Sequence, residues 1–236
     1  MPLVEPDSLK ALAGSALFYP GAGSDYNEPL ELFAPAIAEY WFVDISYFTQ
    51  EAADDTQPLI TSSRVMEFER FELEGPPIAQ MKSRQDASGG TYPFLEPCTR
   101  SEFYTHRETN SRITVHWRRG FGQRSICLAP DIGVFFHRGD SLGEGGSNTH
   151  WLSNRWISDI LGRLRDGGLV VTDGSLAHVS QIHKIQKSDL LPECAFEQAA
   201  PFEKWGRLWT CVGWAGSRNG PTLIWKLDAI KALRAR

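Results

Sequence analysis

The chain has 236 residues, of which 42% are hydrophobic and 11% aromatic, a composition that supports the substantial core of one large α/β domain spanning residues 1–236. Its formal net charge is −5 and it contains no run of Lys and Arg, which argues against a nucleic-acid partner. No apolar run reaches membrane-spanning length and no signal-peptide pattern opens the chain, so the sequence predicts a cytoplasmic protein with no membrane partner.

The four cysteines are far apart in the sequence and none forms a C-x-x-C pair. Such spacing favours reduced thiols over a disulfide framework or a structural zinc site. We therefore expect no metal centre built on cysteine.

The first informative unit spans residues 14–47. Its apolar runs Ala16–Tyr19 and Tyr40–Val43 show no alternation, which predicts parallel strands at residues 16–19 and 40–45 that are buried on both faces. Between them lie the turn Gly21-Ala22-Gly23 and a segment with helical spacing that begins near Glu28. Asp44 closes the second run, 21 residues after Gly23. This layout is typical of a strand–loop–helix–strand unit that binds an adenosine-type cofactor.

Residues 49–111 interrupt this pattern and read as an insertion. Val65–Leu73 alternates apolar and charged residues, which predicts a half-exposed strand. Gly75–Pro97 is rich in proline and has little periodicity, so we interpret it as a long loop that acts as a lid. Two further runs, residues 102–108 and 112–118, predict a hairpin.

Four elements are predicted in the second half of the chain. A glycine-rich loop, residues 137–147, comes at the end of the apolar run Ile132–His137. It precedes a segment in which every fourth residue is apolar, at Leu152, Trp156, Ile160 and Leu164. The predicted elements are a buried strand at Ile132–His137, a helix over residues 152–164, a strand at Leu169–Thr172, and a hairpin of Leu208–Trp214 with Thr222–Leu227.

Several of these segments resemble class I S-adenosylmethionine-dependent methyltransferases. FYPGAGSD is similar to a degenerate first glycine loop, WFVDIS to the second strand with its ribose-binding acid, and ILGRLRDGGLVVTDG to the helix, turn and fifth strand. The resemblance implies a three-layer Rossmann-like α/β fold. Its sheet would be mostly parallel, with a C-terminal antiparallel hairpin and an inserted irregular or β segment. The chain departs from the family at Asp25, where a third glycine is usual, and it lacks the N-methyltransferase tetrapeptide.

The resemblance also implies a binding site for S-adenosylmethionine. Gly21 and Gly23 would let the backbone approach the cofactor, because a Cβ atom at either position would collide with it. Asp44 would accept hydrogen bonds from the ribose hydroxyls, with Ile45 beside the adenine or ribose.

The loop of residues 137–147 is the predicted catalytic segment. His137 or Asp140 would remove a proton from a small-molecule acceptor that is seated between this loop and residues 75–100. The same loop carries Glu144, and its polar groups offer an alternative role in binding a metal or an anion. Asp173 and His178 follow the next strand, whereas His150 is expected on a helix surface and Trp156 in the core.

Two other functions remain open at this stage. One is a non-enzymatic binding protein with a degraded cofactor loop, and the other is a metal-assisted hydrolase or lyase that uses residues 137–147. The sequence does not identify the acceptor molecule or the oligomeric state.

Overall fold

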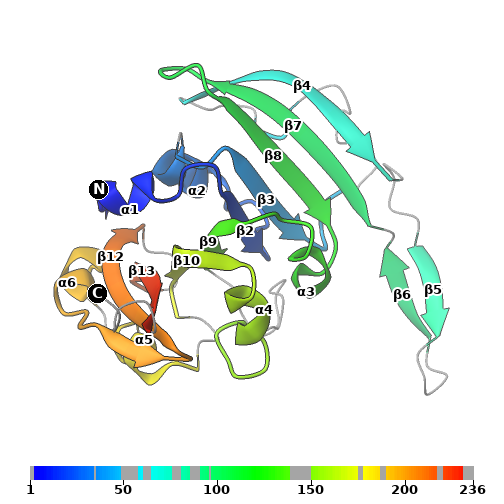
Figure 1. Cartoon of the computed structure of the whole chain (residues 1–236). Helices are drawn as coiled ribbons and strands as arrows, with labels where there is room; N and C mark the ends of the chain where they lie inside the picture. The colour runs from blue at the N-terminus through cyan, green and yellow to red at the C-terminus, as the bar shows by residue number, and fades with distance from the viewer. Residues whose placement is uncertain are drawn as a thin grey trace.

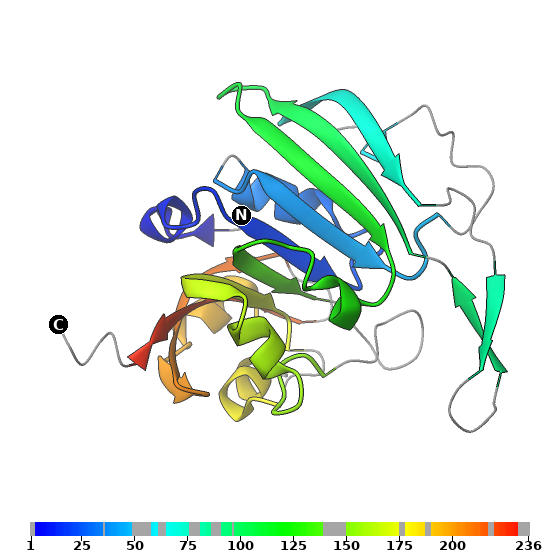
Figure 2. The ribbon, with the colours of Figure 1, turned by 45° about the vertical axis from the view of Figure 1, so that its right-hand side comes forward.

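The computed structural model describes residues 3–34, 36–48, 58–60, 65–75, 81–85, 91–95, 97–138, 150–174, 178–186, 190–216 and 220–230. Its main feature is one twisted sheet of 11 strands, and β5 (Met81–Gln85) and β6 (Thr91–Leu95) form a separate two-stranded sheet (Figures 1 and 2). The main sheet has the order β1-β12-β13-β10-β9-β2-β3-β8-β7-β4, with β11 paired to β12.

Five neighbouring strands at the centre of the sheet are parallel: β10 (Leu164–Thr172), β9 (Ile132–His137), β2 (Ala16–Pro20), β3 (Glu39–Asp44) and β8 (Arg112–Arg119). The chain leaves β2 for β3 on one side and later returns to β9 on the other. The carboxyl ends of β2 and β9 therefore flank the point where the strand order reverses, which is where open α/β sheets bind ligands.

Antiparallel strands extend the sheet at both ends. On one side lie β13 (Thr222–Ala229), β12 (Arg207–Ala215), β1 (Leu3–Val4) and β11 (Phe202–Lys204). On the other side β7 (Cys98–His106) pairs with β8, and β4 (Met66–Glu74) pairs with β7. Residues 49–111 thus contribute two strands to the main sheet itself.

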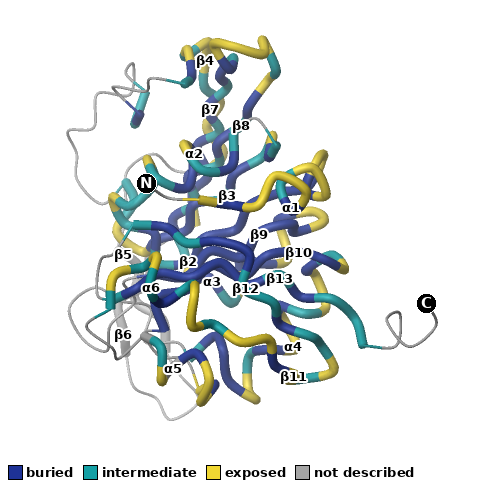
Figure 3. The backbone as a smooth tube through the Cα atoms, turned by 90° about the vertical axis from the view of Figure 1, so that its left-hand side faces the viewer, coloured by how far each residue is buried: buried dark blue, intermediate teal, exposed yellow. Residues whose placement is uncertain are grey.

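The central strands are buried on both faces because consecutive residues alternate between two apolar clusters (Figure 3). Leu17 and Tyr19 of β2 pack in one cluster, and Phe18 packs in the other. This explains why the strand runs show no alternation of polar and apolar residues, and the strands predicted at residues 16–19, 40–45 and 132–137 are confirmed.

The described helices are only four to seven residues long. They are α1 (Pro6–Lys10), α2 (Asn27–Phe33), α3 (Gly122–Ser125), α4 (Ile157–Leu161), α5 (Ser180–Gln186) and α6 (Pro192–Glu197). Such short segments do not build the two helical layers of a Rossmann sandwich.

The predicted three-layer, mostly parallel α/β fold is therefore wrong. Among the described ladders of the main sheet, six are antiparallel and four parallel. The fold is a β-rich mixed sheet with short helices, although the predicted C-terminal antiparallel hairpin is present as β12 and β13.

The helix predicted over residues 152–164 is also wrong in extent. Only Ile157–Leu161 is helical, and Leu164 already belongs to β10. Leu152, Ile160 and Leu164 nevertheless pack in the same apolar cluster, so the four-residue repeat reports a shared buried side rather than one continuous helix.

No helix among the described residues is long and apolar enough to cross a membrane.

Candidate functional site

The glycine turn predicted to bind a cofactor follows β2 and is held by β3. Gly21 and Gly23 both have positive φ, 70° and 51°, a backbone conformation that favours glycine. The N–H groups of Gly21 and Ala22 donate to the Val43 carbonyl, at 2.7 and 3.3 Å. The turn is therefore tied to the neighbouring strand end.

Asp44 completes this attachment. Its Oδ2 accepts a hydrogen bond from the Gly23 N–H at 3.0 Å, and its Oδ1 accepts from the backbone N–H and the hydroxyl of Ser46, at 2.8 and 2.6 Å. The Tyr47 hydroxyl donates to the Gly23 carbonyl at 2.8 Å. The Asp44 carboxylate thus has three hydrogen-bond donors from the protein. Because Asp44 is only 7% exposed, it has little contact with solvent. Its role in binding a ribose stays a prediction.

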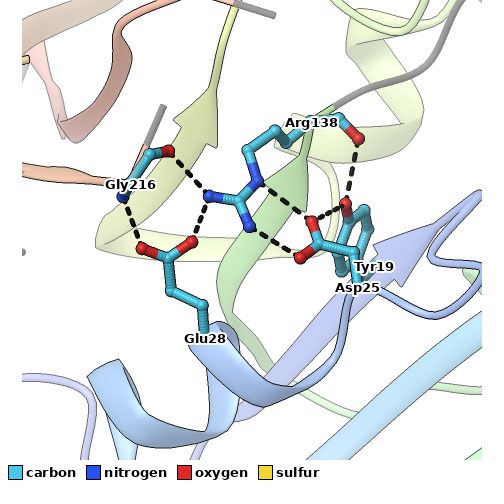
Figure 4. A network of polar contacts seen from close by, with 5 residues as sticks. All are labelled: Tyr19, Asp25, Glu28, Arg138 and Gly216. Atoms are coloured by element: carbon cyan, nitrogen blue, oxygen red, sulfur yellow. Dashed lines mark hydrogen bonds and ion pairs between the residues drawn. The ribbon is translucent and has the colours of Figure 1, made fainter. Parts of the chain in front are cut away.

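A buried ion-pair network lies beside the turn, between the ends of β2 and β9 (Figure 4). The Arg138 guanidinium donates to both carboxylate oxygens of Asp25, with Nη2–Oδ1 2.7 Å and Nε–Oδ2 3.0 Å. Its Nη1 donates to Glu28 and to the Gly216 carbonyl, the latter at 2.9 Å. The Tyr19 hydroxyl lies 2.8 Å from Asp25 Oδ2.

The charge state of this network follows from its contacts. Burial disfavours the charged form of Arg138, whose side chain is 4% exposed, but the hydrogen bonds and charges of Asp25 and Glu28 outweigh burial and raise its pKa. A permanently charged guanidinium thus joins the loop after β2, helix α2 and the segment after β12. Asp25, which stands where the methyltransferase loop usually has a third glycine, is an ion-pair partner here.

The predicted catalytic residues are only partly described. His137 is fully buried at the carboxyl end of β9, opposite Thr172 of β10. Asp140 and the other residues of the loop from 139 to 149 lie outside the described residues. Ile45 is 48% exposed and directly follows Asp44. Within the described ranges, no group of three or more His, Cys, Asp or Glu is arranged to hold a metal ion.

A second site, a pocket of about 390 Å³, lies between the turns before α4, the start of α5 and β11. We call it the histidine pocket. The described residues that line it are His150, Ser153, Asn154, Arg155, Trp156, His178 and Lys204. No Asp or Glu is in this lining set.

The two imidazoles of the histidine pocket face each other. The ring centroids of His150 and His178 are 4.5 Å apart with an interplanar angle of 59°. The backbone N–H of His178 donates to the Leu152 carbonyl at 2.9 Å, which joins the segment after β10 to the turn that carries His150. His150 Nδ1 is buried and makes no hydrogen bond within the described part of the chain.

Two cations border the same pocket. The Arg155 guanidinium lies 5.1 Å from the Trp156 ring centroid, and the Lys204 ammonium lies 5.4 Å from that of Trp205. Asn154 accepts a hydrogen bond from the indole N–H of Trp205 at 2.8 Å, which holds the turn against β11. The pocket therefore combines positive charge, hydrogen-bond donors and an aromatic surface.

Sequence reasoning missed this pocket. His150 was expected on a helix surface and Trp156 in a helix core, whereas both lie in the turns that precede α4. His178 was expected in the loop after the strand at Leu169–Thr172. The only local signal was the density of polar and aromatic residues in HWLSNRW, and nothing in the sequence linked it to Lys204.

The chain matches no protein-family model, no curated protein and no solved structure. The resemblance to class I S-adenosylmethionine-dependent methyltransferases is wrong, because those proteins are helix-rich Rossmann folds and this chain is a mixed sheet with few, short helices. Its function therefore has to be argued from the sites alone.

Proposed function

We propose that this chain binds a small anionic ligand in the histidine pocket. The observation that carries the proposal is the lining set, which contains two histidines, Arg155 and Lys204 but no described carboxylate. Guanidinium and ammonium groups donate charge-assisted hydrogen bonds to phosphate or carboxylate oxygens, and these are stronger than neutral ones. The pocket thus favours a phosphorylated or carboxylated molecule.

The size and the aromatic lining suggest what else the ligand carries. A pocket of about 390 Å³ is in the range of small-molecule sites and larger than a lone phosphate needs. Trp156 lines the pocket, is half-buried, and offers a ring face on which a ligand can stack. We therefore propose a ligand with an anionic group joined to a planar ring.

Isothermal titration calorimetry with phenyl phosphate tests this proposal. Titrations with phenol and with inorganic phosphate measure the separate contributions of the ring and of the anionic group to binding. Replacing both Arg155 and Lys204 by Gln is expected to weaken phenyl phosphate binding about a hundredfold or more, because each charge-assisted hydrogen bond contributes about 1.5–3 kcal/mol. Arg112→Gln, an exposed arginine at the start of β8, is the matched control and leaves binding unchanged. Equal binding by all variants contradicts the proposal.

A second candidate function is the binding of a nucleoside cofactor such as S-adenosylmethionine near Asp44. One observation favours it. Ile45 and Phe121 are 48% and 53% exposed, and they lie on the segments that follow Asp44 and Arg119, which are register partners on β3 and β8. Exposed apolar side chains at neighbouring strand ends offer a surface for a purine. Binding of S-adenosylmethionine that Ile45→Glu removes supports this candidate, and no binding to the wild-type chain rules it out.

The ligand is a small molecule, and a cytoplasmic location is supported by the four cysteines, all of which are free thiols. A catalytic role for His137 with Asp140, or a metal-assisted reaction at residues 137–147, stays a prediction.

A further inference from the structure

A separate polar cluster lies on the sheet face away from Tyr40 and Phe42. Three adjacent strands contribute to it: Glu39 and Trp41 from β3, His116 from β8, and Ser101 from β7. His116 is the direct register partner of both Trp41 and Ser101. Cross-strand partners on one face have neighbouring side chains, so the sheet itself sets this arrangement.

The three polar groups form a chain of contacts. Ser101 Oγ lies 2.8 Å from His116 Nδ1, and His116 Nε2 lies 3.6 Å from Glu39 Oε1. A carboxylate beside Nε2 favours the tautomer that carries its proton there. Nδ1 is then the acceptor for the Ser101 hydroxyl, which is the relation between a nucleophile and its general base.

Trp41 contacts both the histidine and its carboxylate partner. Its ring stacks on the His116 imidazole with centroids 4.1 Å apart and an interplanar angle of 23°. Its indole N–H donates to Glu39 Oε1 at 2.6 Å. The imidazole and the carboxylate are therefore held in place before any ligand arrives.

The protonation state and the access of the cluster fit a base. Burial lowers the pKa of His116 to about 4, so the imidazole is neutral at neutral pH and its unprotonated nitrogen is available to Ser101, although it is a weaker base than an exposed imidazole. The side chains of His116 and Glu39 are 17% and 32% exposed. Other charged groups on this face are Arg118, next along β8, and Arg70, Glu72 and Glu74 of β4, of which Glu72 lies opposite Ser101.

We propose that Ser101 is an activated nucleophile that attacks ester carbonyls, with His116 as its general base and Glu39 as a positioning residue. In the first step the Ser101 oxygen bonds to the carbonyl carbon, its proton passes to His116 Nδ1, and the alkoxide leaves with that proton as an alcohol. In the second step water, deprotonated by His116, attacks the acyl-serine, releases the acid and restores the Ser101 hydroxyl. The site is independent of the histidine pocket.

A fluorophosphonate probe, in which serine displaces fluoride, tests the nucleophile directly. We expect mass spectrometry of the labelled wild-type protein to map the adduct to Ser101. His116→Gln is expected to slow labelling by about a hundredfold, in the range of a general-base contribution. Ser111→Ala, which removes a serine from the turn before β8, is the control and leaves labelling unchanged.

Two further readouts separate catalysis from a structural role. The labelling rate of the wild type should fall with a midpoint near pH 4 as His116 becomes protonated, and Glu39→Gln should shift this midpoint while the circular dichroism spectrum stays the same. Absence of labelling, an adduct on another serine, or an unchanged rate in His116→Gln overturns the proposal.

Discussion

Arg138 and Asp25 form a bidentate ion pair across the ends of β9 and β2, with both guanidinium-to-carboxylate distances at or below 3.0 Å. The pair is almost fully buried, and it occupies the place where an open sheet of parallel strands would otherwise receive a ligand.

Breaking this pair should destabilise the fold strongly. Arg138→Met leaves the carboxylates of Asp25 and Glu28 without their cation, and the loss of one partner of a buried pair costs about 3–5 kcal/mol. Urea denaturation measures the free energy of unfolding. Arg165→Met, which breaks the more exposed pair with Asp131, is the control and should cost about 1 kcal/mol or less. Equal costs for the two variants would show that the Arg138 network is not structural.

Asp44 should act as a structural residue even without a ligand. Asp44→Ala removes the acceptor of the Gly23 N–H and of two Ser46 donors, and we expect a loss of about 1–3 kcal/mol in unfolding free energy. Hydrogen exchange of the Gly23 amide should accelerate in the same variant. Asp7→Ala, at an exposed position in α1, provides the comparison. Unchanged exchange at Gly23 would argue against the contact.

Glu102 is a second buried carboxylate whose removal should be costly. It is fully buried and accepts hydrogen bonds from the Leu59 N–H at 2.9 Å, the Tyr104 hydroxyl at 2.5 Å and the Trp117 indole N–H at 2.8 Å. It also pairs with Arg100 at 2.9 Å. Glu102→Gln should cost about 3 kcal/mol, because it removes the carboxylate charge that pairs with the buried guanidinium of Arg100.

The control for this position is Glu72→Gln, since the Glu72 side chain is 59% exposed on β4. Thermal unfolding followed by tryptophan fluorescence is the measurement. A Glu102→Gln protein as stable as Glu72→Gln would contradict the network.

The pH dependence of stability should carry a contribution from His116. Its folded pKa is about 4, below the ordinary value of 6.5, so between these pH values the unfolded chain binds more protons. The unfolding free energy should therefore fall as the pH drops from 6.5 to 4, by about 2–3 kcal/mol from this group. His116→Gln should flatten the curve in that window, whereas His178→Gln, at an exposed position, should not.

The strands were predictable where burial leaves a local pattern. The runs around Leu17 and Phe42 have no polar alternation because both faces of these strands are covered. The proximity of Asp44 to the glycine turn was also predictable, since parallel neighbouring strands end together. The contact itself is direct, from the Asp44 carboxylate to the Gly23 amide.

Long-range pairing was not predictable from local pattern. The pairing of β3 with β8 joins residues 75 positions apart, such as Glu39 and Thr114, so residues 49–111 read as an insertion rather than as strands of the main sheet. The apolar repeat from Leu152 to Leu164 likewise indicated one helix. A turn, a short helix and a strand that pack on the same apolar cluster give a similar spacing of buried residues. The contact between the His150 and His178 rings depends on tertiary packing alone, and no local sequence pattern indicates it.

The most direct test of anion binding in the histidine pocket is a nuclear magnetic resonance titration of protein labelled at its six histidines. Variants His150→Gln and His178→Gln assign the two pocket imidazoles. On addition of phenyl phosphate, we expect these two resonances to shift while those of His106 and His116 stay in place. Shifts at His137 alone, at the end of β9, or no shift at any histidine would contradict binding in this pocket.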